Sequence, residues 1–182
     1  MDFQTLNPLS TQILIRTATD QDLIHLEWDG EYRHFRKLYQ EIYESSKKGD
    51  AILWVVEMNG SGIIGQVFIQ LESVRKELAD GSTRAYLYGF RIQPEYRNQG
   101  IGSYSLRHVE TDLYSRGFVK VTLNVGRENI DARRLYDRNG YEIVGVESGN
   151  WSYLDENGLR KRVNEPAWRM EKRLDGKQVN SG

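Results

Sequence analysis

Apolar and polar residues recur with two periods in the first half of the chain, and each period predicts its own kind of element. Apolar positions at helical spacing predict two helices, one capped by Thr19 or Asp20 and an amphipathic one over residues 30–49. The run 59–62 is a hairpin turn signal, and Gly65 is predicted as a bulge in the strand after it. Runs rich in β-branched and aromatic residues predict three strands, at 13–16, 51–58 and 63–71.

Strands and helices alternate in the second half. After a polar loop at 75–83, an apolar strand runs to Ile92. Leu106, Val109 and Leu113 then fall on one face of a helix. The remaining predicted elements are a strand at 118–125, a short helix capped by Asn129, a strand at 141–146, a turn at 155–158 and a last strand at 167–174.

This order of elements predicts a single domain of the α/β (α+β) class. Hairpins followed by strand–helix–strand–helix–strand form a mixed sheet with helices on both faces. The sequence has no internal repeat, low-complexity run or long linker that would divide the chain. We expect a domain over residues 11–174, a loose N-terminal arm at 1–10 and a flexible polar tail at 175–182.

Composition then narrows the class of protein. The 182 residues are 38% apolar and 28% charged, which is typical of one globular domain. The net charge of −1 argues against a nucleic-acid partner, and the lack of cysteine excludes disulfides, thiolate zinc sites and a cysteine nucleophile. Three histidines stand without ligand spacing, so we expect no metal. The chain has no leader pattern and no membrane-length apolar run, so we expect a cytoplasmic protein without membrane contact.

The stretch 86–103 carries the strongest chemical signal. Its strand ends before Pro94, which has no N–H for a sheet ladder, and Gly100 and Gly102 precede the helix. A strand, a glycine turn and a helix start together leave several amide N–H groups free beside the positive end of the helix dipole. We therefore expect a phosphate or pyrophosphate site, where the glycines let the backbone approach the anion.

The spacing of this turn resembles a known loop. Residues 97–102 follow the pattern Arg/Gln-x-x-Gly-x-Gly/Ala, which resembles the pyrophosphate loop of the GNAT superfamily of acyl-CoA-dependent N-acyltransferases. Residues 129–141 resemble the second signature of that family, and the resemblance covers roughly residues 12–174. A dinucleotide fingerprint is not met because residue 105 is serine, and the Gly-Lys-Ser/Thr of triphosphate loops is absent.

The resemblance implies a mostly antiparallel sheet of about seven strands, with a V-shaped split between the strands at 84–93 and 118–125. Acetyl-CoA, the implied co-substrate, would place its pantetheine arm along the first of these strands and its pyrophosphate on the loop amides. Asn129 would contact the arm or an ordered water. The cofactor-binding residues implied in this way are Phe90, Arg91, Ile92, Arg97, Asn98, Gln99, Gly100, Ile101, Gly102, Ser103, Asn129 and Tyr136.

Tyr136 is also the implied catalytic residue. By the resemblance its hydroxyl lies near the thioester sulfur, where a group of pKa near 10 can hydrogen-bond or protonate the departing thiolate. Several family members carry a carboxylate base on the central strand, and the matching position here is Tyr86. The base stays open between a water held by Tyr86 or Tyr88 and a carboxylate, Glu57 or Glu72.

Two segments that mix aromatic and acidic residues, 28–43 and 147–165, are expected to recognise the acceptor. Carboxylates beside aromatic rings suit a cationic amine, although 29–31 is also readable as a solvated helix start. The adenosine phosphates need cations, and the sequence does not rank the five candidate arginines: Arg91, Arg97, Arg133, Arg134 and Arg138.

Together these features predict an N-acetyltransferase that moves an acetyl or other short acyl group from acetyl-CoA to a primary amine by direct attack in a ternary complex. The acceptor, a small-molecule amine or a protein amine, stays open, and so do the acyl length and a homodimer. The alternative is a non-catalytic acyl-CoA sensor or regulatory module. The intact pair Asn129 and Tyr136 favours the enzyme.

Overall fold

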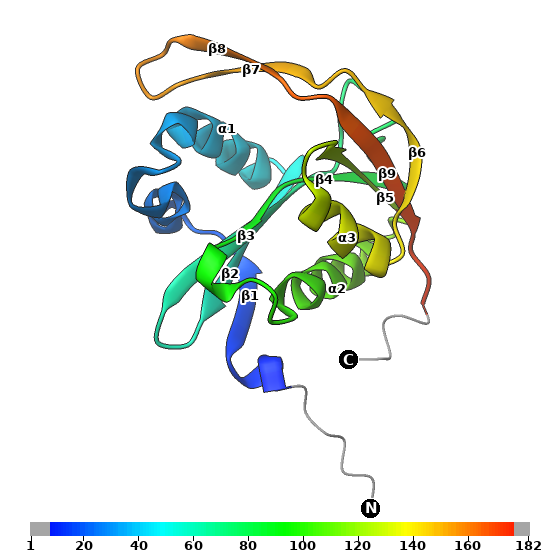
Figure 1. Ribbon diagram of the computed structural model, residues 1–182, viewed down its shortest axis with the longest axis horizontal. Coiled ribbons are helices and arrows are strands. Elements are labelled where there is room, and N and C mark those ends of the chain that lie inside the picture. The colour runs from blue at the N-terminus through cyan, green and yellow to red at the C-terminus, as the bar shows by residue number, and fades with distance from the viewer. Residues whose placement is uncertain (1–7, 177–182) are drawn as a thin grey trace, which may run out of the picture.

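The computed structural model describes residues 8–176, which form a seven-stranded sheet and a separate two-stranded hairpin (Figure 1). The seven strands lie in the order β1-β2-β3-β4-β5-β9-β6, and among the described strands only β4 and β5 run parallel. The strands of the large sheet are β1 (Ile13–Thr17), β2 (Ala51–Met58), β3 (Gly62–Gln70), β4 (Arg84–Ile92), β5 (Lys120–Gly126), β6 (Glu142–Glu147) and β9 (Ala167–Arg173). The hairpin consists of β7 (Asn150–Leu154) and β8 (Arg160–Asn164).

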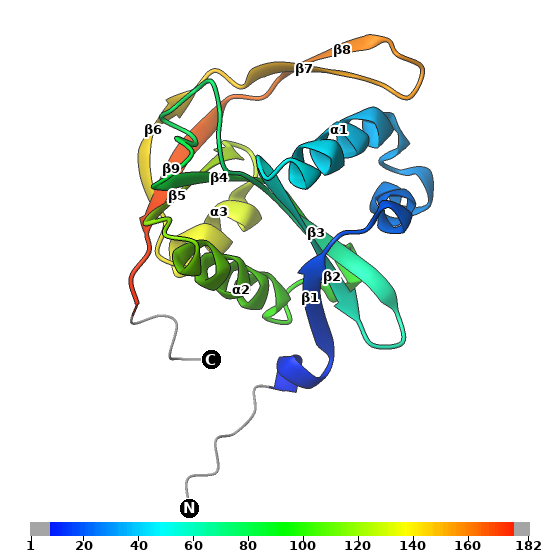
Figure 2. The same ribbon diagram turned by 180° about the vertical axis from the view of Figure 1, so that it is seen from behind.

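Helices lie on both faces of the sheet (Figures 1 and 2). One face carries α1 (Arg36–Lys47) with the 3-10 segments η2 (Asp20–Gly30) and η3 (Arg33–Phe35). The other face carries α2 (Ile101–Ser115) and α3 (Ile130–Arg138). Two further 3-10 turns are η1 (Pro8–Thr11) and η4 (Pro94–Tyr96). The predicted α/β (α+β) class, with a mostly antiparallel sheet of about seven strands, is confirmed.

Each face of the sheet has its own apolar core. Leu106, Val109 and Leu113 of α2 are 0% exposed, which confirms the predicted helical stripe. Full burial of such a side chain contributes about 1.5–3 kcal/mol. On the other face, Tyr39 and Ile42 of α1 pack against β2 and β3 in a second cluster of buried residues. The sheet is therefore held from both sides, and both cores reach its middle strands.

Strands β4 and β5 separate part-way along their length. Their parallel ladder ends at the pair Leu87–Leu123, although β4 continues to Ile92. Just past this pair β4 bulges at Gly89, which has φ 58° and whose Cβ, if it had one, would lie 2.4 Å from the Phe68 ring. The predicted split is confirmed, and the sequence prediction missed the glycine bulge beside it.

The first predicted helix is wrong in type. η2 is a 3-10 segment, and Trp28 and Asp29 inside it have left-handed φ values of 45° and 55°. This conformation is uncommon for non-glycine residues and interrupts a regular helix. The amphipathic helix begins only at Arg36, after η3, instead of directly after residue 30.

Other differences concern single positions. The bulge in β3 falls at Ile64, because Val56 pairs with Gly65 and the next residue of β2 pairs with Ile63. Gly65 itself lies so close to β4 that a Cβ would be 2.6 Å from a carbonyl oxygen of that strand. The strand predicted at 118–125 begins only at Lys120, and Val119 before it is 41% exposed whereas Thr122 within it is fully buried. The turn at 155–158 is present, but its flanking strands β7 and β8 were not predicted.

The termini are only partly described. Pro8–Thr11 forms the turn η1, and Leu9 packs against the main core. Residues 1–7 and 177–182, in the predicted arm and tail, lie outside the described residues, so the division into arm, domain and tail stays a prediction. Between residues 8 and 176, none of the helices has both the length and the apolar character to cross a membrane, and no three His, Cys, Asp or Glu side chains are grouped as metal ligands.

Candidate functional site

A cavity of about 300 Å³ lies where β4 ends, between the loop that follows it, the N-terminal part of α2 and helix α3. All the residues predicted to bind the cofactor line this cavity except Gln99 and Ile101. The Gln99 side-chain amide donates to the Glu95 carbonyl at 3.0 Å, and Ile101 is 1% exposed within the core. Two motifs about thirty residues apart in sequence therefore meet in one hollow.

The loop before α2 leaves a row of backbone donors unbonded. Within residues 8–176, no hydrogen bond is made by the amide N–H groups of residues 98–103. Asn98 and Gly100 have left-handed φ values of 58° and 82°, which curl the loop. The Arg97 side chain ties the loop to the end of β4, because its Nε donates to the Ile92 carbonyl at 2.7 Å. These donors lie at the positive end of the α2 dipole, which is a site for an anion.

The two glycines of the motif serve different purposes. Gly100 needs the left-handed conformation, and a Cβ there would have only Leu9 nearby, at 3.6 Å. Gly102 lies against α3, where a Cβ would be 3.2 Å from Leu135. One glycine thus shapes the loop and the other lets α2 and α3 approach.

The split leaves one edge of β4 open. Arg91 and Ile92 still pair with β3 through Gln66 and Gly65, while the β4–β5 ladder ends at Leu87. Among the described strands, none bonds the peptide groups of β4 that point toward β5 beyond this residue. An extended chain carrying amides can add to such an edge in the manner of a further strand.

Tyr136 is a buried residue in the wall of the cavity. The residue is 7% exposed, its ring meets that of Tyr141 edge-to-face at 5.6 Å, and it lines the cavity. Within the described residues its hydroxyl forms no hydrogen bond. Burial raises the pKa of this hydroxyl well above its usual value, so it is protonated at neutral pH and can act as a donor. Asn129 caps α3 as predicted, because its Oδ1 accepts from Ala132 N at 3.2 Å.

A buried charge pair fixes Tyr141, the residue whose ring packs on that of Tyr136. The Tyr141 hydroxyl donates to Glu110 Oε1 at 2.9 Å, and Lys172 Nζ donates to Glu110 Oε2 at 2.7 Å. Glu110 and Lys172 are 5% and 7% exposed. The sequence prediction missed both residues. A signal existed, since Glu110 falls on the apolar stripe of α2 four residues after Leu106.

The five candidate arginines separate into groups. The Arg91 guanidinium turns away from the phosphate loop, donates to the Tyr39 hydroxyl at 2.9 Å and lies 3.8 Å above the Tyr32 ring. This placement contradicts its proposed role as a phosphate cation, although its backbone lines the cavity. Arg97 and Arg138 line the cavity, whereas the remaining two pair with acids of α3: Arg133 with Asp137 at 3.7 Å and Arg134 with Asp131 at 4.0 Å.

The two segments expected to recognise the acceptor do meet. Phe35 lies 4.8 Å from Tyr153 and 6.2 Å from Trp151 between ring centroids, and His34 lies 5.9 Å from Tyr153. One acid of these segments is less available than predicted, whereas Asp29 and Glu31 are exposed. Asp155 accepts from the backbone of its own turn. The charge placed on the aromatic rings is instead the Arg91 guanidinium.

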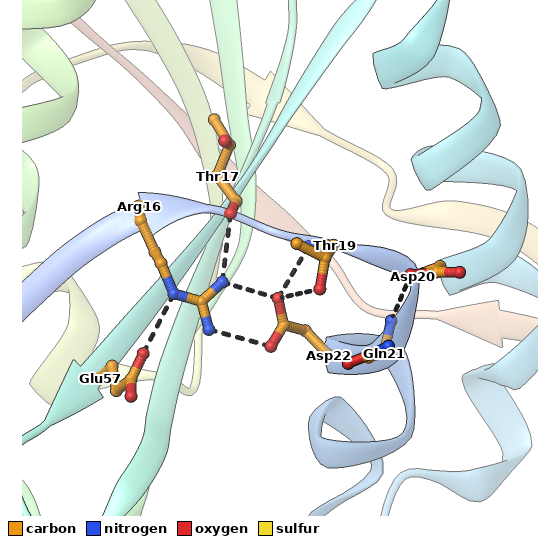
Figure 3. Close-up of polar contacts among 7 residues, drawn as sticks. All are labelled: Arg16, Thr17, Thr19, Asp20, Gln21, Asp22 and Glu57. Carbon is orange, nitrogen blue, oxygen red and sulfur yellow. Dashed lines mark hydrogen bonds and ion pairs between the residues drawn. The ribbon is translucent and has the colours of Figure 1, made fainter.

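The two carboxylates named as candidate bases lie elsewhere. Glu57 Oε2 accepts from Arg16 Nε at 3.0 Å, in a network at the β1–β2 end of the sheet that also includes Asp22 (Figure 3). Glu72 is exposed and pairs with Lys76 at 2.8 Å. The carboxylate whose charge acts on Tyr86 is Glu147, at the end of β6. Only the pairing of β6 with β9 brings it there, so no local sequence signal marked it.

A split sheet with an anion loop at its open end is the arrangement that the GNAT resemblance implied. The sequence profile of the Acetyltransferase (GNAT) family matches residues 21–141, more than half of the chain. The chain therefore belongs to the GNAT acetyltransferase family.

Two curated relatives are N-acetyltransferases by name. The chain is 28% identical over 94 residues to the uncharacterized N-acetyltransferase YycN of Bacillus subtilis strain 168, which covers 52% of this chain and 57% of that protein. It is 27% identical over 96 residues to the 5-NmdU N-acetyltransferase of Pseudomonas phage PaMx11, covering 53% and 62%. The chain thus matches less than two thirds of the length of either relative.

Solved structures share the fold at low identity. The acetyltransferase of Salmonella typhimurium that modifies the N-terminal serine of ribosomal protein L7/L12 superposes with a TM-score of 0.70 at 17% identity, covering 92% of this chain and 98% of that one. A spermidine N-acetyltransferase chimera from Vibrio cholerae SpeG and hSSAT gives 0.67 at 19% identity, covering 93% and 99%. A ribosomal L7/L12 α-N-acetyltransferase in complex with coenzyme A gives 0.67 at 16% identity, covering 92% and 97%.

Proposed function

We propose that this protein transfers an acetyl or other short acyl group from acetyl-CoA to a primary amine, by direct attack in a ternary complex. The observation that carries the proposal is the row of unbonded amide N–H groups at 98–103, which opens into the same cavity as Tyr136. The pyrophosphate of acetyl-CoA has the acceptor oxygens that such a row needs. The donors are not saturated by the described part of the protein, as they would be in a purely structural turn.

The open edge of β4 supports the same ligand. The pantetheine arm carries two amides and would pair with the backbone of Phe90, Arg91 and Ile92 like an added strand. This path leads from the phosphate loop to the split, where β4 and β5 part. The thioester would then lie beside Tyr136 and Asn129.

Tyr136 would act as the acid of the reaction. A thiolate leaves when the amine attacks, and the protonated hydroxyl donates to its sulfur. The amine must first be neutral. At pH 7 this costs about 4.6 kcal/mol for a lysine-type amine and about 1.4 kcal/mol for an α-amino group.

The relatives act on different amines, spermidine and a protein N-terminus among them by their names. For this chain we propose an acceptor that is either a small-molecule or a protein amine, in a cytoplasmic enzyme without bound metal. A homodimer stays open.

The test mixes the protein with acetyl-CoA and a panel of amines: spermidine, a peptide with a free N-terminus and a capped peptide with a free lysine. Released thiol is followed, and coenzyme A and acetyl-CoA are titrated by calorimetry in parallel. We expect heat with both ligands and thiol release with at least one amine. Binding without thiol release for every amine would support a sensor instead. Absence of both heat and thermal protection would overturn the acyl-CoA site.

A further inference from the structure

On the face covered by α1, the side chains next to the point where β4 and β5 separate are uncharged, and the one charged side chain of β4 further along this face among the described residues is Arg91, whose guanidinium donates to Tyr39 of α1. Tyr86 pairs across the ladder with Thr122. Because side chains alternate along a strand, Tyr88 and Asn124 follow on the same face, just past the last pair. Tyr88 packs into the α1-side core, and its ring stacks on that of Tyr86 at 5.4 Å. An amine that reaches the thioester from this face meets these groups first.

Among the described residues, the side-chain oxygen of Asn124, Oδ1, is a buried acceptor without a hydrogen bond. The residue opposite on β9 is Arg169, but its guanidinium turns to Glu147 at 3.5 Å. Buried acceptors are normally bonded, and the N–H of a neutral amine is a suitable donor.

Two carboxylates, Glu147 and Glu171, lie on the same face of β6 and β9, and cations hold both. Arg75 reaches Glu147 with two N–H groups, at 2.8 and 3.2 Å. Each oxygen of both carboxylates has a cationic partner, so neither is a free base at the split. The ion pairs of this face are Arg75–Glu147 at 2.8 Å, Arg169–Glu147 at 3.5 Å, Lys120–Glu171 at 2.8 Å and Arg84–Glu171 at 3.3 Å.

The tyrosine hydroxyls beside the split are proton donors at neutral pH. Burial and, after it, the charge of Glu147 raise the pKa of Tyr86 to about 12, while side-chain hydrogen bonding with the Asn124 amide partly offsets the rise. Burial also raises the pKa of Tyr136, on which the Tyr86 hydroxyl acts in the same direction. Neither hydroxyl can take the proton of an ammonium group at pH 7.

We infer that uncharged groups, Asn124 Oδ1 among them, bind the acceptor as a neutral amine, so that the enzyme prefers the α-amino group of a peptide over lysine or polyamine amines. This inference rests on the proposed acetyl transfer. An amine of low pKa is more often neutral in solution, and a site without a free base gains the full benefit of that difference.

The reaction balances without a protein carboxylate. The ammonium proton passes to solvent before binding. The nitrogen lone pair then forms the C–N bond, the C–S bond breaks, and the sulfur takes a proton from Tyr136. The second proton lost by the nitrogen leaves as the amide forms, and a proton from solvent restores Tyr136. The products are the acetylated amine and free coenzyme A.

The test compares two peptides of one sequence, one with a free N-terminus and a capped lysine, the other with a capped N-terminus and a free lysine. The ratio of kcat/KM values is measured from pH 7 to pH 9. At pH 7 we expect the α-amine to be favoured about 200-fold, the ratio of neutral fractions of groups with pKa values of about 8 and 10.4. The ratio should shrink as the pH rises, because the lysine peptide gains about tenfold per pH unit.

Equal or faster reaction of the lysine peptide at pH 7, or a ratio independent of pH, would overturn the inference while leaving the proposed acetyl transfer intact. Failure of the proposed function looks different, since no amine would then release thiol.

A pair of variants tests whether Asn124 is responsible for the preference for the α-amine. Asn124→Asp places a carboxylate at the split and should narrow the preference at pH 7 at least tenfold by accepting the lysine proton. Asn124→Leu removes the amide without adding charge and should lower kcat/KM for both peptides at least fivefold, with the preference kept. Thermal melting verifies that each variant is folded. A folded Asn124→Asp variant with an unchanged preference, or a fully active Asn124→Leu variant, would contradict the role of this residue.

Discussion

The Tyr136 side chain is buried and yet lines the cavity where we propose that acetyl-CoA binds. Its ring packs on Tyr141, which the Glu110–Lys172 pair holds in turn. Removing one member of a buried pair leaves an uncompensated charge, so this support is rigid. The rigidity matters because a proton donor must stay within hydrogen-bond reach of the sulfur.

Tyr136→Phe keeps the ring and removes only the hydroxyl. We expect turnover to fall at least tenfold while the Kd for acetyl-CoA stays within about twofold, because the hydroxyl acts in the transition state and makes no bond that positions the cofactor. Thiol-release kinetics and calorimetry measure the two quantities. Tyr114→Phe, at a 40% exposed tyrosine of α2, is the control and should change neither. Undiminished turnover of Tyr136→Phe would remove the acid assignment.

Among the elements, helix α2 has a left-handed glycine next to each of its two ends. At its start Gly100 has φ 82° and lies within the row of unbonded donors. Just past its end Gly117 has φ 93°, and a Cβ placed there would have nothing within 4 Å. A branched residue is strained at both positions, but only Gly100 lies at the proposed anion site.

Gly100→Val and Gly117→Val form a matched pair. We expect both to lower the thermal midpoint to a similar extent, and only Gly100→Val to abolish acetyl-CoA binding. The strain of a left-handed valine is common to both, whereas the branched side chain intrudes on the phosphate at one position only. Calorimetry on the folded variants decides. Acetyl-CoA binding of wild-type strength by Gly100→Val would show that the anion lies elsewhere.

Strand β1 and segment η2 are joined by a charge contact that gives the fold a pH dependence. Arg16 donates to both carboxylate oxygens of Asp22, at 2.7 and 3.0 Å, and Thr19 N donates to the same group (Figure 3). The hydrogen bond from Arg16 lowers the pKa of Asp22 from 3.8 to about 2. A carboxylate with a lowered pKa stabilises the folded state above its unfolded pKa, and this stability is lost as the pH falls through the lowered value.

The wild-type protein should therefore lose part of its free energy of unfolding between about pH 4 and pH 2. Asp22→Asn should be less stable than wild type at pH 7 and lose less on acidification, because it has no charge to give up. Urea unfolding at pH 7, 4 and 2.5 measures both curves. Asp20→Asn, at an exposed neighbour, is the control and should follow wild type. Parallel curves for Asp22→Asn and wild type would exclude the effect.

For the whole molecule, prediction from the sequence succeeded best for features that depend on residues close together in the chain. The turn at 97–102 and the cap at Asn129 depend on residues within one or two helical turns, and both lie at the cavity as expected. The order of strands and helices followed from periodicity, and with it the fold class. Amphipathic α2 is the clearest case, since its apolar stripe is fully buried.

Features that depend on residues far apart in the sequence could not be predicted from local sequence patterns. Glu147 meets Arg75, 72 positions away, only after β6 has paired with β9. The hairpin β7–β8 has mostly exposed side chains on both faces, so the alternation that marks a half-buried strand is weak. The left-handed backbone at Trp28 and Asp29 likewise has no marker in residue type, because neither is glycine.

The open edge of β4 has a consequence for the energy of the folded chain. A ligand that occupies this edge and the donors at 98–103 stands in for a missing neighbouring strand, and it binds only to the folded protein. At a hundred times its Kd such a ligand adds about 2.7 kcal/mol to the free energy of unfolding. Acetyl-CoA should accordingly raise the melting temperature in proportion to the logarithm of its concentration and slow amide hydrogen exchange on both sides of the split. Within a cell, supply of this metabolite would then govern how long the enzyme survives proteolysis as well as how fast it works.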